Sequence, residues 1–216
     1  GATAGFAFDG DGDRLIAVDE NGRKLTGDQI LLICAHALKE AGRLKNNLVV
    51  STVMSNLGFA KACREYGIRR HESRVGDRYV LEDMQRLGAV VGGEESGHII
   101  LLDHHTTSDG IITALQLLAV MLEKDRRLSE LAEMMDVYPQ KLINVPVGKK
   151  PEIATVPRLA EAIRRVESEL GDEGRVLVRY SGTQGLCRVM VEAATMAITE
   201  KYCRQLATEV RENLGK

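Results

Sequence analysis

Three carboxylates stand at alternate positions near the start of the chain, in the segment FDGDGDR at residues 8–14. Asp9, Asp11 and Asp13 supply the hard oxygen ligands that Mg²⁺ or Ca²⁺ prefers, and the glycines between them let the backbone turn. Apolar runs precede and follow this acidic loop (residues 9–14), so we expect it to link two strands. The sequence therefore predicts a divalent-cation site at a strand end, a setting that favours phosphate chemistry.

Three other interpretations of the acidic loop compete with this one. Asp and Gly are common in ordinary turns, where the Asp side chain bonds its own backbone. The spacing from Asp9 to Glu20 also fits an EF-hand loop, but Arg14 occupies the position where that loop needs glycine, and strands rather than helices are expected on both sides. A phosphatase with an aspartyl nucleophile shares the Asp-x-Asp pattern and stays open as the alternative enzyme.

A second polar segment, GGEESGH at residues 92–98, lies between two apolar runs. This glutamate loop presents Glu94, Ser96 and His98, and a carboxylate can accept hydrogen bonds from two neighbouring sugar hydroxyls. The loop therefore suits sugar recognition. A solvated hairpin loop, or a glutamate acid/base pair as in a glycosidase, stays open on the residues alone.

A third segment, RYSGTQ from Arg179, is followed by Arg188. Two guanidinium groups, the hydroxyls of Ser181 and Thr183, and backbone amides around Gly182 match what a phosphate dianion requires. Ser-Gly-Thr is also common in plain hairpin turns. The two arginines favour a phosphate site in this basic loop (residues 179–188).

One short polar loop, Gly76-Asp77-Arg78, enters a predicted helix and is a candidate active-site loop. Asp77 as a helix cap and Arg78 as a surface charge is an equally good interpretation. Ser55-Asn56 is better explained as a helix N-cap than as a nucleophile, and Asp109 can cap the helix expected from residue 111.

Composition sets the class of protein. The chain has 216 residues, 44% of them hydrophobic, which is ample for a buried core. Its net charge of -2 leaves no basic stripe for nucleic acid. The apolar runs are too short to span a membrane, and no signal peptide is evident. We therefore expect a cytoplasmic protein without nucleic-acid or membrane partners. The four cysteines lack metal-binding spacing and are expected to be buried and reduced: Cys34, Cys63, Cys187 and Cys203.

Helix and strand patterns alternate up to a boundary near Tyr138, and the order then changes. The alternation predicts an α/β fold with a mixed, largely parallel βαβ sheet, followed by a small α+β domain. Asn21-Gly22 predicts a hairpin turn. The expected strands are 15–18, 23–25, 48–52, 68–73, 89–91, 99–102, 142–147, 175–180 and 186–193, and the expected helices are 28–42, 58–66, 79–87, 111–123, 159–170 and 199–214.

The three loops, in this order on an α/β piece and a small α+β piece, resemble the alpha-D-phosphohexomutases. Segments 53–59, 75–80 and 93–98 are similar to the branch of that family that acts on glucosamine phosphates. The resemblance implies an isomerase in which a phosphoserine gives its phosphoryl group to a hexosamine phosphate. The bisphosphorylated sugar then reorients and returns its other phosphate, which interconverts the 6-phosphate and the 1-phosphate.

The resemblance also implies a role for each loop. The acidic loop would hold Mg²⁺, with Arg14 near the transferring group, and the glutamate loop would hold sugar hydroxyls. The basic loop would grip the phosphate that does not react. The implied residues are Asp9, Asp11 and Asp13 for the metal, Glu94, Ser96 and His98 for the sugar, and Arg179, Ser181, Gly182, Thr183 and Arg188 for the phosphate.

The sequence departs from the family pattern at two places. The phosphate motif usually reads RPSGTEP, whereas Tyr180, Gln184 and Gly185 stand here at its Pro, Glu and final Pro positions. No segment resembles the serine loop either. The resemblance therefore implies that residues 1–22 are the tail of a second domain, 23–138 the third and 139–216 the fourth.

Further expectations follow from the implied layout. The N-terminal domains would be the chain's partners, the fragment alone would be inactive, and three aspartates without the phosphoserine would bind metal poorly. A homodimer stays open. So do two other functions, a phosphoglucomutase or phosphomannomutase and a non-catalytic sugar-phosphate binding module.

Overall fold

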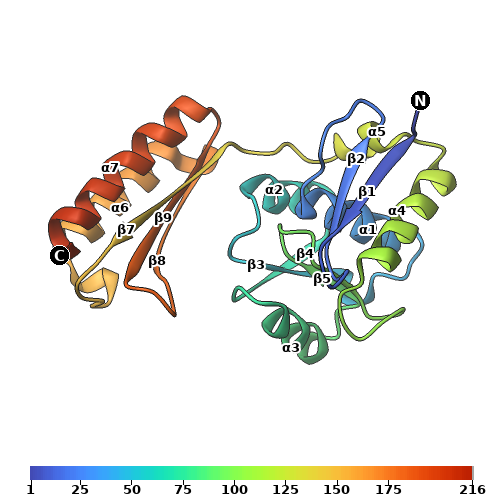
Figure 1. The fold of residues 1–216 in the computed structure, drawn as a ribbon, viewed down its shortest axis with the longest axis horizontal. Coiled ribbons are helices and arrows are strands. Elements are labelled where there is room, and N and C mark those ends of the chain that lie inside the picture. Colours follow the sequence, from blue (N-terminus) through green and yellow to red (C-terminus); the bar gives the residue numbers. More distant parts are fainter. Residues whose placement is uncertain (216) are drawn as a thin grey trace. The chain divides into compact units, whose positions relative to one another are not determined.

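A computed structural model describes residues 1–215, and the chain divides into two compact units (Figure 1). The first is Gly1–Val137, and the second begins at Tyr138. The first unit holds a two-stranded and a four-stranded sheet with their helices, and the second holds a three-stranded sheet with two long helices. The predicted fold class, an α/β part followed by a small α+β part, is confirmed.

The acidic loop joins two antiparallel strands, β1 (Ala4–Phe8) and β2 (Leu15–Asp19). The prediction that strands flank the loop is confirmed, so the helices that an EF-hand requires are not there. The predicted strand at residues 23–25 is wrong, since only an isolated bridge from Lys24 to Val18 forms. The chain leaves the hairpin at this point because Thr26 already caps the next helix.

The four-stranded sheet has the order β4-β3-β5-β6, in which β3 is parallel to β4 and β5, and β6 is antiparallel to β5. The central strand β3 is buried along its whole length, as expected for a sheet with helices on both faces. Helix α5 was not predicted, because five residues are too few to show a period. The elements are α1 (Gly27–Glu40), η1 (Lys45–Asn47), β3 (Leu48–Thr52), α2 (Leu57–Glu65), β4 (Arg69–Ser73), α3 (Asp77–Leu87), β5 (Val91–Gly93), β6 (Ile99–Leu101), α4 (Gly110–Lys124) and α5 (Leu128–Ala132).

Local hydrogen bonds fix where these helices begin. The Thr26 hydroxyl accepts from the amide of Gln29, and the Gln29 side chain accepts from the amide of Thr26, which forms a capping box on α1. Asp109 caps α4 through the amide of Ile112 at 2.9 Å, as predicted. Asn56 caps α2 through the amide of Gly58, also as predicted.

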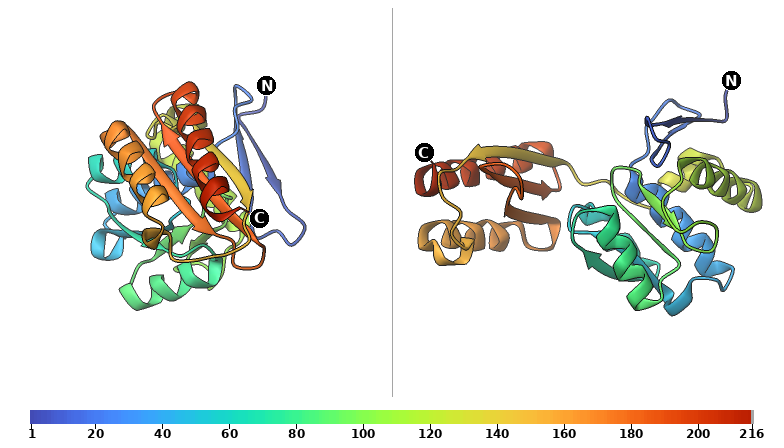
Figure 2. Two further views of the ribbon diagram at one scale, coloured as in Figure 1. Left: turned by 90° about the vertical axis from the view of Figure 1, so that its left-hand side faces the viewer. Right: turned by 60° about the horizontal axis from the view of Figure 1, so that its bottom comes forward.

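The second unit is a three-stranded antiparallel sheet in the order β7-β9-β8. Its two long helices lie side by side, as the orange and red ribbons of Figure 2 show. Helix α7 begins three residues before the predicted start, because the Thr195 hydroxyl accepts from the amide of Ile198 and caps it. The elements are β7 (Gln140–Pro146), η2 (Ile153–Thr155), α6 (Pro157–Leu170), η3 (Gly171–Glu173), β8 (Gly174–Tyr180), β9 (Leu186–Ala193) and α7 (Met196–Leu214).

The four cysteines are buried and free, as the sequence predicted. Burial raises the pKa of the Cys34 and Cys63 thiols to about 12, and those of Cys187 and Cys203 to about 11. Within residues 1–215, no helix is both long and apolar enough to cross a membrane.

Candidate functional site

The acidic loop brings its three aspartates together. One carboxylate oxygen from each of Asp9, Asp11 and Asp13 lies within 4.8 Å of the others. The amide of Arg14 donates to Oδ1 of Asp9 at 3.1 Å, and the Arg14 Nε atom lies 3.7 Å from Oδ2 of Asp9 and 4.0 Å from Oδ1 of Asp13. The exposed guanidinium of Arg14 thus lies near two of the three carboxylates, which leaves a local excess of negative charge.

The electrostatics of the loop fit a hard divalent cation. Desolvation raises the pKa of Asp13, the charges of Asp11 and Asp9 add to this rise, and His98 opposes it. Desolvation also raises the pKa of Asp9, but hydrogen bonds from Arg14 and Asp13 outweigh it and hold that pKa below its ordinary value. Oδ1 of Asp13 is buried and has no hydrogen-bond partner among the described residues. A clustered set of carboxylates with an oxygen left over is the donor set that Mg²⁺ takes.

Two other segments anchor the acidic loop through backbone contacts. The amide of Leu15 donates to the carbonyl of Gly97 at 3.1 Å, and the amide of Gly110 donates to the carbonyl of Gly12 at 2.9 Å. The Ser108 hydroxyl donates to the carbonyl of Asp13. The acidic loop is therefore held by the glutamate loop on one side and by the start of α4 on the other.

Glycine makes one of these approaches possible. A Cβ at Gly97 would lie 2.2 Å from the carbonyl oxygen of Leu15, and its φ of +95° is one that other residues rarely adopt. The main role of Gly97 in the structure is to let two chain segments pack backbone against backbone.

The glutamate loop is the turn between β5 and β6, so its hairpin setting is observed. Oε1 of Glu94 accepts from the amide of Gly76 at 2.9 Å, and this bond joins the glutamate loop to the loop before α3. Ser96 is exposed, whereas His98 is 3% exposed and places Nε2 3.3 Å from Oδ2 of Asp13.

The loop before α3 differs in detail from its prediction. Gly76, not Asp77, is the N-cap residue of α3, and Asp77 is the first helical residue. Asp77 is exposed, and the exposed Arg78 pairs through Nε with Glu82 at 2.8 Å. The bond between Gly76 and Glu94 nevertheless places this loop beside the glutamate loop.

The basic loop lies at one end of the sheet of the second unit. Arg179 on β8 and Arg188 on β9 are directly opposite in the strand register, so two positive charges face one another. Desolvation lowers the pKa of Arg179, and the charge of Arg188 lowers it further. An anion is the group that would relieve this repulsion.

The turn of the basic loop contains two hydroxyl groups, one buried and one exposed, and an exposed glycine. Ser181 is buried, and its hydroxyl accepts from the amide of Gln184 at 3.3 Å. Gly182 and Thr183 are exposed. The structure thus brings all five predicted phosphate residues to the same end of the sheet.

Sequence reasoning missed two residues that support these loops. Lys150 donates from Nζ to the carbonyl of Ser181 at 2.7 Å, which adds a third cation to the basic loop. The Lys149-Lys150 pair, between Pro146 and Pro151, was a sequence signal that could have identified Lys150 as a candidate. Ser108 carried no such signal, because only the fold brings it to Asp13, 95 residues away.

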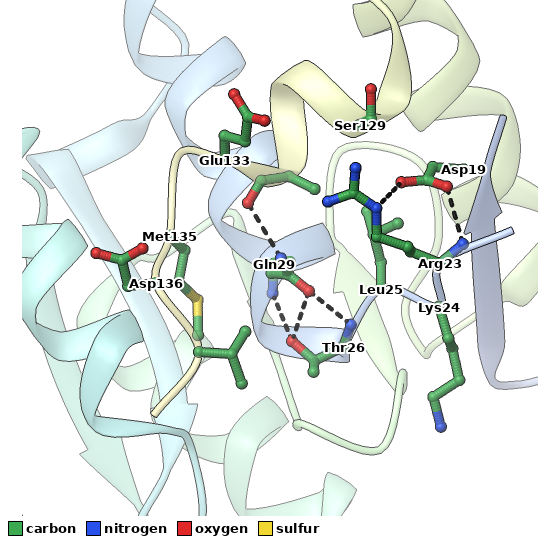
Figure 3. Close-up of a pocket in the computed structure, with 12 residues that line it drawn as sticks. Asp19, Arg23, Lys24, Leu25, Thr26, Gln29, Ser129, Glu133, Met135 and Asp136 are labelled. Carbon is green, nitrogen blue, oxygen red and sulfur yellow. Dashed lines mark hydrogen bonds and ion pairs between the residues drawn. The ribbon is translucent and has the colours of Figure 1, made fainter. Parts of the chain in front are cut away.

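A hollow of about 370 Å³ in the first unit does not coincide with these loops (Figure 3). It is lined from the far end of β2, where Asp19 pairs with Arg23, and from α1, where Thr26 and Gln29 form the capping box. The Gln29 side chain also donates to the carbonyl of Ala132 at 3.0 Å. The polar groups named here are therefore already bonded to their neighbours.

The fold defines a mixed α/β unit that carries acidic and glutamate loops, followed by an α+β unit that carries a basic loop. Residues 26–138 match the sequence profile of the phosphoglucomutase/phosphomannomutase alpha/beta/alpha domain III, and residues 142–209 match that of the C-terminal domain. The chain belongs to the phosphoglucomutase/phosphomannomutase family.

Curated relatives are similar over the whole chain. It is 67% identical over 215 residues to a phosphoglucosamine mutase of Syntrophobacter fumaroxidans and 59% identical to one of Syntrophus aciditrophicus. In both cases the alignment covers 100% of the chain and 48% of the relative. The chain therefore spans about half the length of the curated relatives it matches.

Solved structures share the fold. An N-acetylphosphoglucosamine mutase of Aspergillus fumigatus superposes with a TM-score of 0.81 at 22% identity, over 96% of this chain and 48% of that one. The same fungal enzyme in complex with GlcNAc-6P and magnesium gives a TM-score of 0.80, also at 22% identity, with the same coverage.

Proposed function

We propose that the chain forms part of a phosphoglucosamine mutase, an isomerase that interconverts glucosamine 6-phosphate and glucosamine 1-phosphate. The observation that carries this proposal is the 67% identity, along the whole chain, to a relative of that name. In the layout we propose, residues 1–22 end the second domain, residues 23–138 form the third, and residues 139–216 form the fourth.

In this proposal the acidic loop holds Mg²⁺ through Asp9, Asp11 and Asp13. The clustered oxygens and the unbonded Oδ1 of Asp13 support it, as does the magnesium complex of the fungal neighbour. The cation would offset negative charge on a transferring phosphoryl group. Arg14, with its guanidinium beside two of these carboxylates, adds positive charge at the same place.

Recognition of the sugar falls to the glutamate loop in this proposal. One carboxylate oxygen of Glu94 accepts a hydrogen bond from the amide of Gly76, and the second oxygen can accept one from a sugar hydroxyl. The exposed hydroxyl of Ser96 is open to the same ligand. Asp77 and Arg78 lie in the adjoining loop and would contribute to this end of the site.

Binding of the phosphate that does not react falls to the basic loop. The facing guanidiniums of Arg179 and Arg188 are fork-shaped donors, and Ser181 and Thr183 add hydroxyls around Gly182. Binding energy gained at a group remote from the reaction orients the sugar for transfer. The phosphoserine nucleophile would come from the other domains, so the 216-residue chain alone should show no turnover.

The test of this proposal is a chimaera in which the chain replaces the matching half of the Syntrophobacter fumaroxidans relative. We expect it to convert glucosamine 6-phosphate to the 1-phosphate, followed by ³¹P NMR, faster than it converts glucose or mannose 6-phosphate. A preference for glucose or mannose phosphate would instead indicate a phosphoglucomutase or phosphomannomutase. Turnover by the 216-residue chain alone would contradict a nucleophile outside it.

A titration separates the phosphate role from catalysis. Arg179→Ala should weaken binding of glucosamine 6-phosphate by about 2 kcal/mol, roughly thirty-fold, since a charge-assisted bond is lost. Arg175→Ala is the matched control on the same strand, where Arg175 pairs with Glu192 at 3.0 Å, and should leave this affinity unchanged. Equal affinity in both variants would show that the basic loop is not part of the binding site.

A further inference from the structure

The sheet of the second unit has one face in the core and one open face. Val145 of β7 and Cys187 of β9 are paired in the strand register, and both are fully buried in the same core cluster as Leu206 of α7. Because side chains alternate between the two faces of a strand, the residues next to this pair lie on the open face. That face carries three rows of residues that are directly opposite one another across β7, β9 and β8: Asn144, Arg188 and Arg179; Leu142, Met190 and Leu177; Gln140, Glu192 and Arg175.

The far row, which is Gln140, Glu192 and Arg175, lies away from the basic loop and balances its own charge. Glu192 is 0% exposed, and its carboxylate accepts from Nε2 of Gln140 and from Nε of Arg175, each at 3.0 Å. A carboxylate between an amide and a guanidinium thus binds both of its neighbours. The positive charge of the row is offset within the row.

The near row, which is Asn144, Arg188 and Arg179, lies beside the basic loop and has a different centre. An amide stands at one end and a guanidinium at the other, as in the far row, but the central residue is Arg188. Nε of Arg188 is buried and has no hydrogen-bond partner among residues 1–215. Nothing within the near row offsets its two positive charges. An anion bound over Arg188 would play the part that Glu192 plays in the far row.

Asn144 is placed to share such an anion. It is exposed, and it lies directly opposite Arg188, where the Cβ atoms of a cross-strand pair are about 5 Å apart. Its amide offers two N–H donors, and the oxygens of a phosphate group are strong acceptors. We infer that Asn144 is a further ligand of the phosphate that does not react, and that its Nδ2 donates to a phosphate oxygen beside Arg188. This inference rests on the phosphate site proposed for the basic loop.

The experiment titrates glucosamine 6-phosphate into the 216-residue chain and follows amide signals of the second unit by NMR, which reports weak affinities directly. Asn144→Ala removes the donor, and Asn144→Asp places a negative charge at the same position with little change in size. The matched controls are Leu142→Ala and Leu142→Asp, on the same strand and the same face but in the neighbouring apolar row. Denaturant unfolding of each variant checks that it is folded.

We expect Asn144→Ala to bind the sugar phosphate about five-fold more weakly, because a hydrogen bond to a charged group is lost. Asn144→Asp should bind about twenty-fold more weakly, because it also adds repulsion. Leu142→Ala should match the wild type, and Leu142→Asp should bind only about two-fold more weakly, since its charge is farther from the phosphate and is screened by solvent.

Unchanged affinity in Asn144→Ala would overturn the inference, and the phosphate site itself would still stand if Arg179→Ala binds more weakly. Equal weakening in Asn144→Asp and Leu142→Asp would also overturn it, since charge alone would then matter. No binding by the wild-type chain would reject the phosphate site, and the inference with it.

Discussion

The acidic loop of the first unit and the basic loop of the second unit differ in what holds them in place. Long-range backbone bonds from Leu15 to Gly97 and from Gly110 to Gly12 fix the acidic loop. The basic loop is the end of a hairpin, and it is supported by the nearby segment 147–151, through bonds from Val147 to Gly185, from Lys150 to Ser181 and from Tyr180 to Pro151. The acidic loop is therefore held by segments far away in the sequence, whereas the basic loop is held by a nearby segment and places two guanidiniums opposite one another.

The same substitution, made at the glycine that packs against Leu15 beside the acidic loop and at a glycine of the basic loop, should show this difference most clearly. Gly97→Ala would place a Cβ 2.2 Å from a carbonyl oxygen at a positive φ, and should destabilise the first unit by about 3 kcal/mol. In the basic loop, a Cβ at Gly182 would meet no atom within 4 Å, and Gly182→Ala should cost less than about 0.5 kcal/mol.

Urea unfolding, followed by amide signals assigned to each unit, measures both changes separately. The two units need not unfold together, so one global transition would not suffice. Similar losses in the two variants would mean that the acidic loop is no better anchored than the basic loop.

Asp83 is a carboxylate of the first unit whose charge is balanced by neighbouring side chains, and it serves as a comparison for the carboxylates of the acidic loop. The guanidinium of Arg86 lowers its pKa the most, the nearby Ser73 and His71 side chains add to this, and together they bring the pKa from 3.8 to about 2. Because the folded pKa is the lower one, the stabilisation is present above about pH 4 and is lost as the pH falls towards 2. The side chain is 22% exposed, so solvent screening reduces this stabilisation to about 1–2 kcal/mol.

Asp83→Asn should accordingly destabilise the first unit by that amount at pH 7 and make no difference at pH 2. Denaturant unfolding at a series of pH values measures this. Glu82→Gln on the same helix is the control, since its pair with Arg78 is exposed and should contribute little. A constant difference between Asp83→Asn and the wild type from pH 7 to pH 2 would contradict the pKa shift.

The charge conflict in the basic loop predicts an effect of opposite sign. Arg188→Leu removes one of two facing guanidiniums, so without an anion it should stabilise the second unit by about 0.5 kcal/mol. Added inorganic phosphate should stabilise the wild type, because it binds the folded state, and should stabilise the variant much less. Thermal unfolding with and without phosphate measures both the change in stability of the variant and the stabilisation by phosphate. Destabilisation of the phosphate-free variant would show that the two arginines do not oppose one another.

The sequence was most informative where a local pattern decides the structure. Strand β9 was predicted at its exact bounds, and Asn56 and Asp109 were correctly identified as helix caps, because periodicity and capping are local properties. The contact of Ser108 with Asp13 and the backbone packing at Gly97 could not be predicted, since they join segments far apart in the chain.

The smallest effect concerns one of the bonds that support the basic loop from outside. Lys150→Ala removes the bond from Nζ to the carbonyl of Ser181, and with it a charge close to the two arginines. We expect about 0.5 kcal/mol less stability and phosphate binding about three-fold weaker, since a partly exposed bond contributes little in water. Lys149→Ala is the matched control and should change neither quantity. Calorimetric phosphate titration measures the affinity, and an equal loss in both variants would mean that net charge, rather than the bond to Ser181, supports the basic loop.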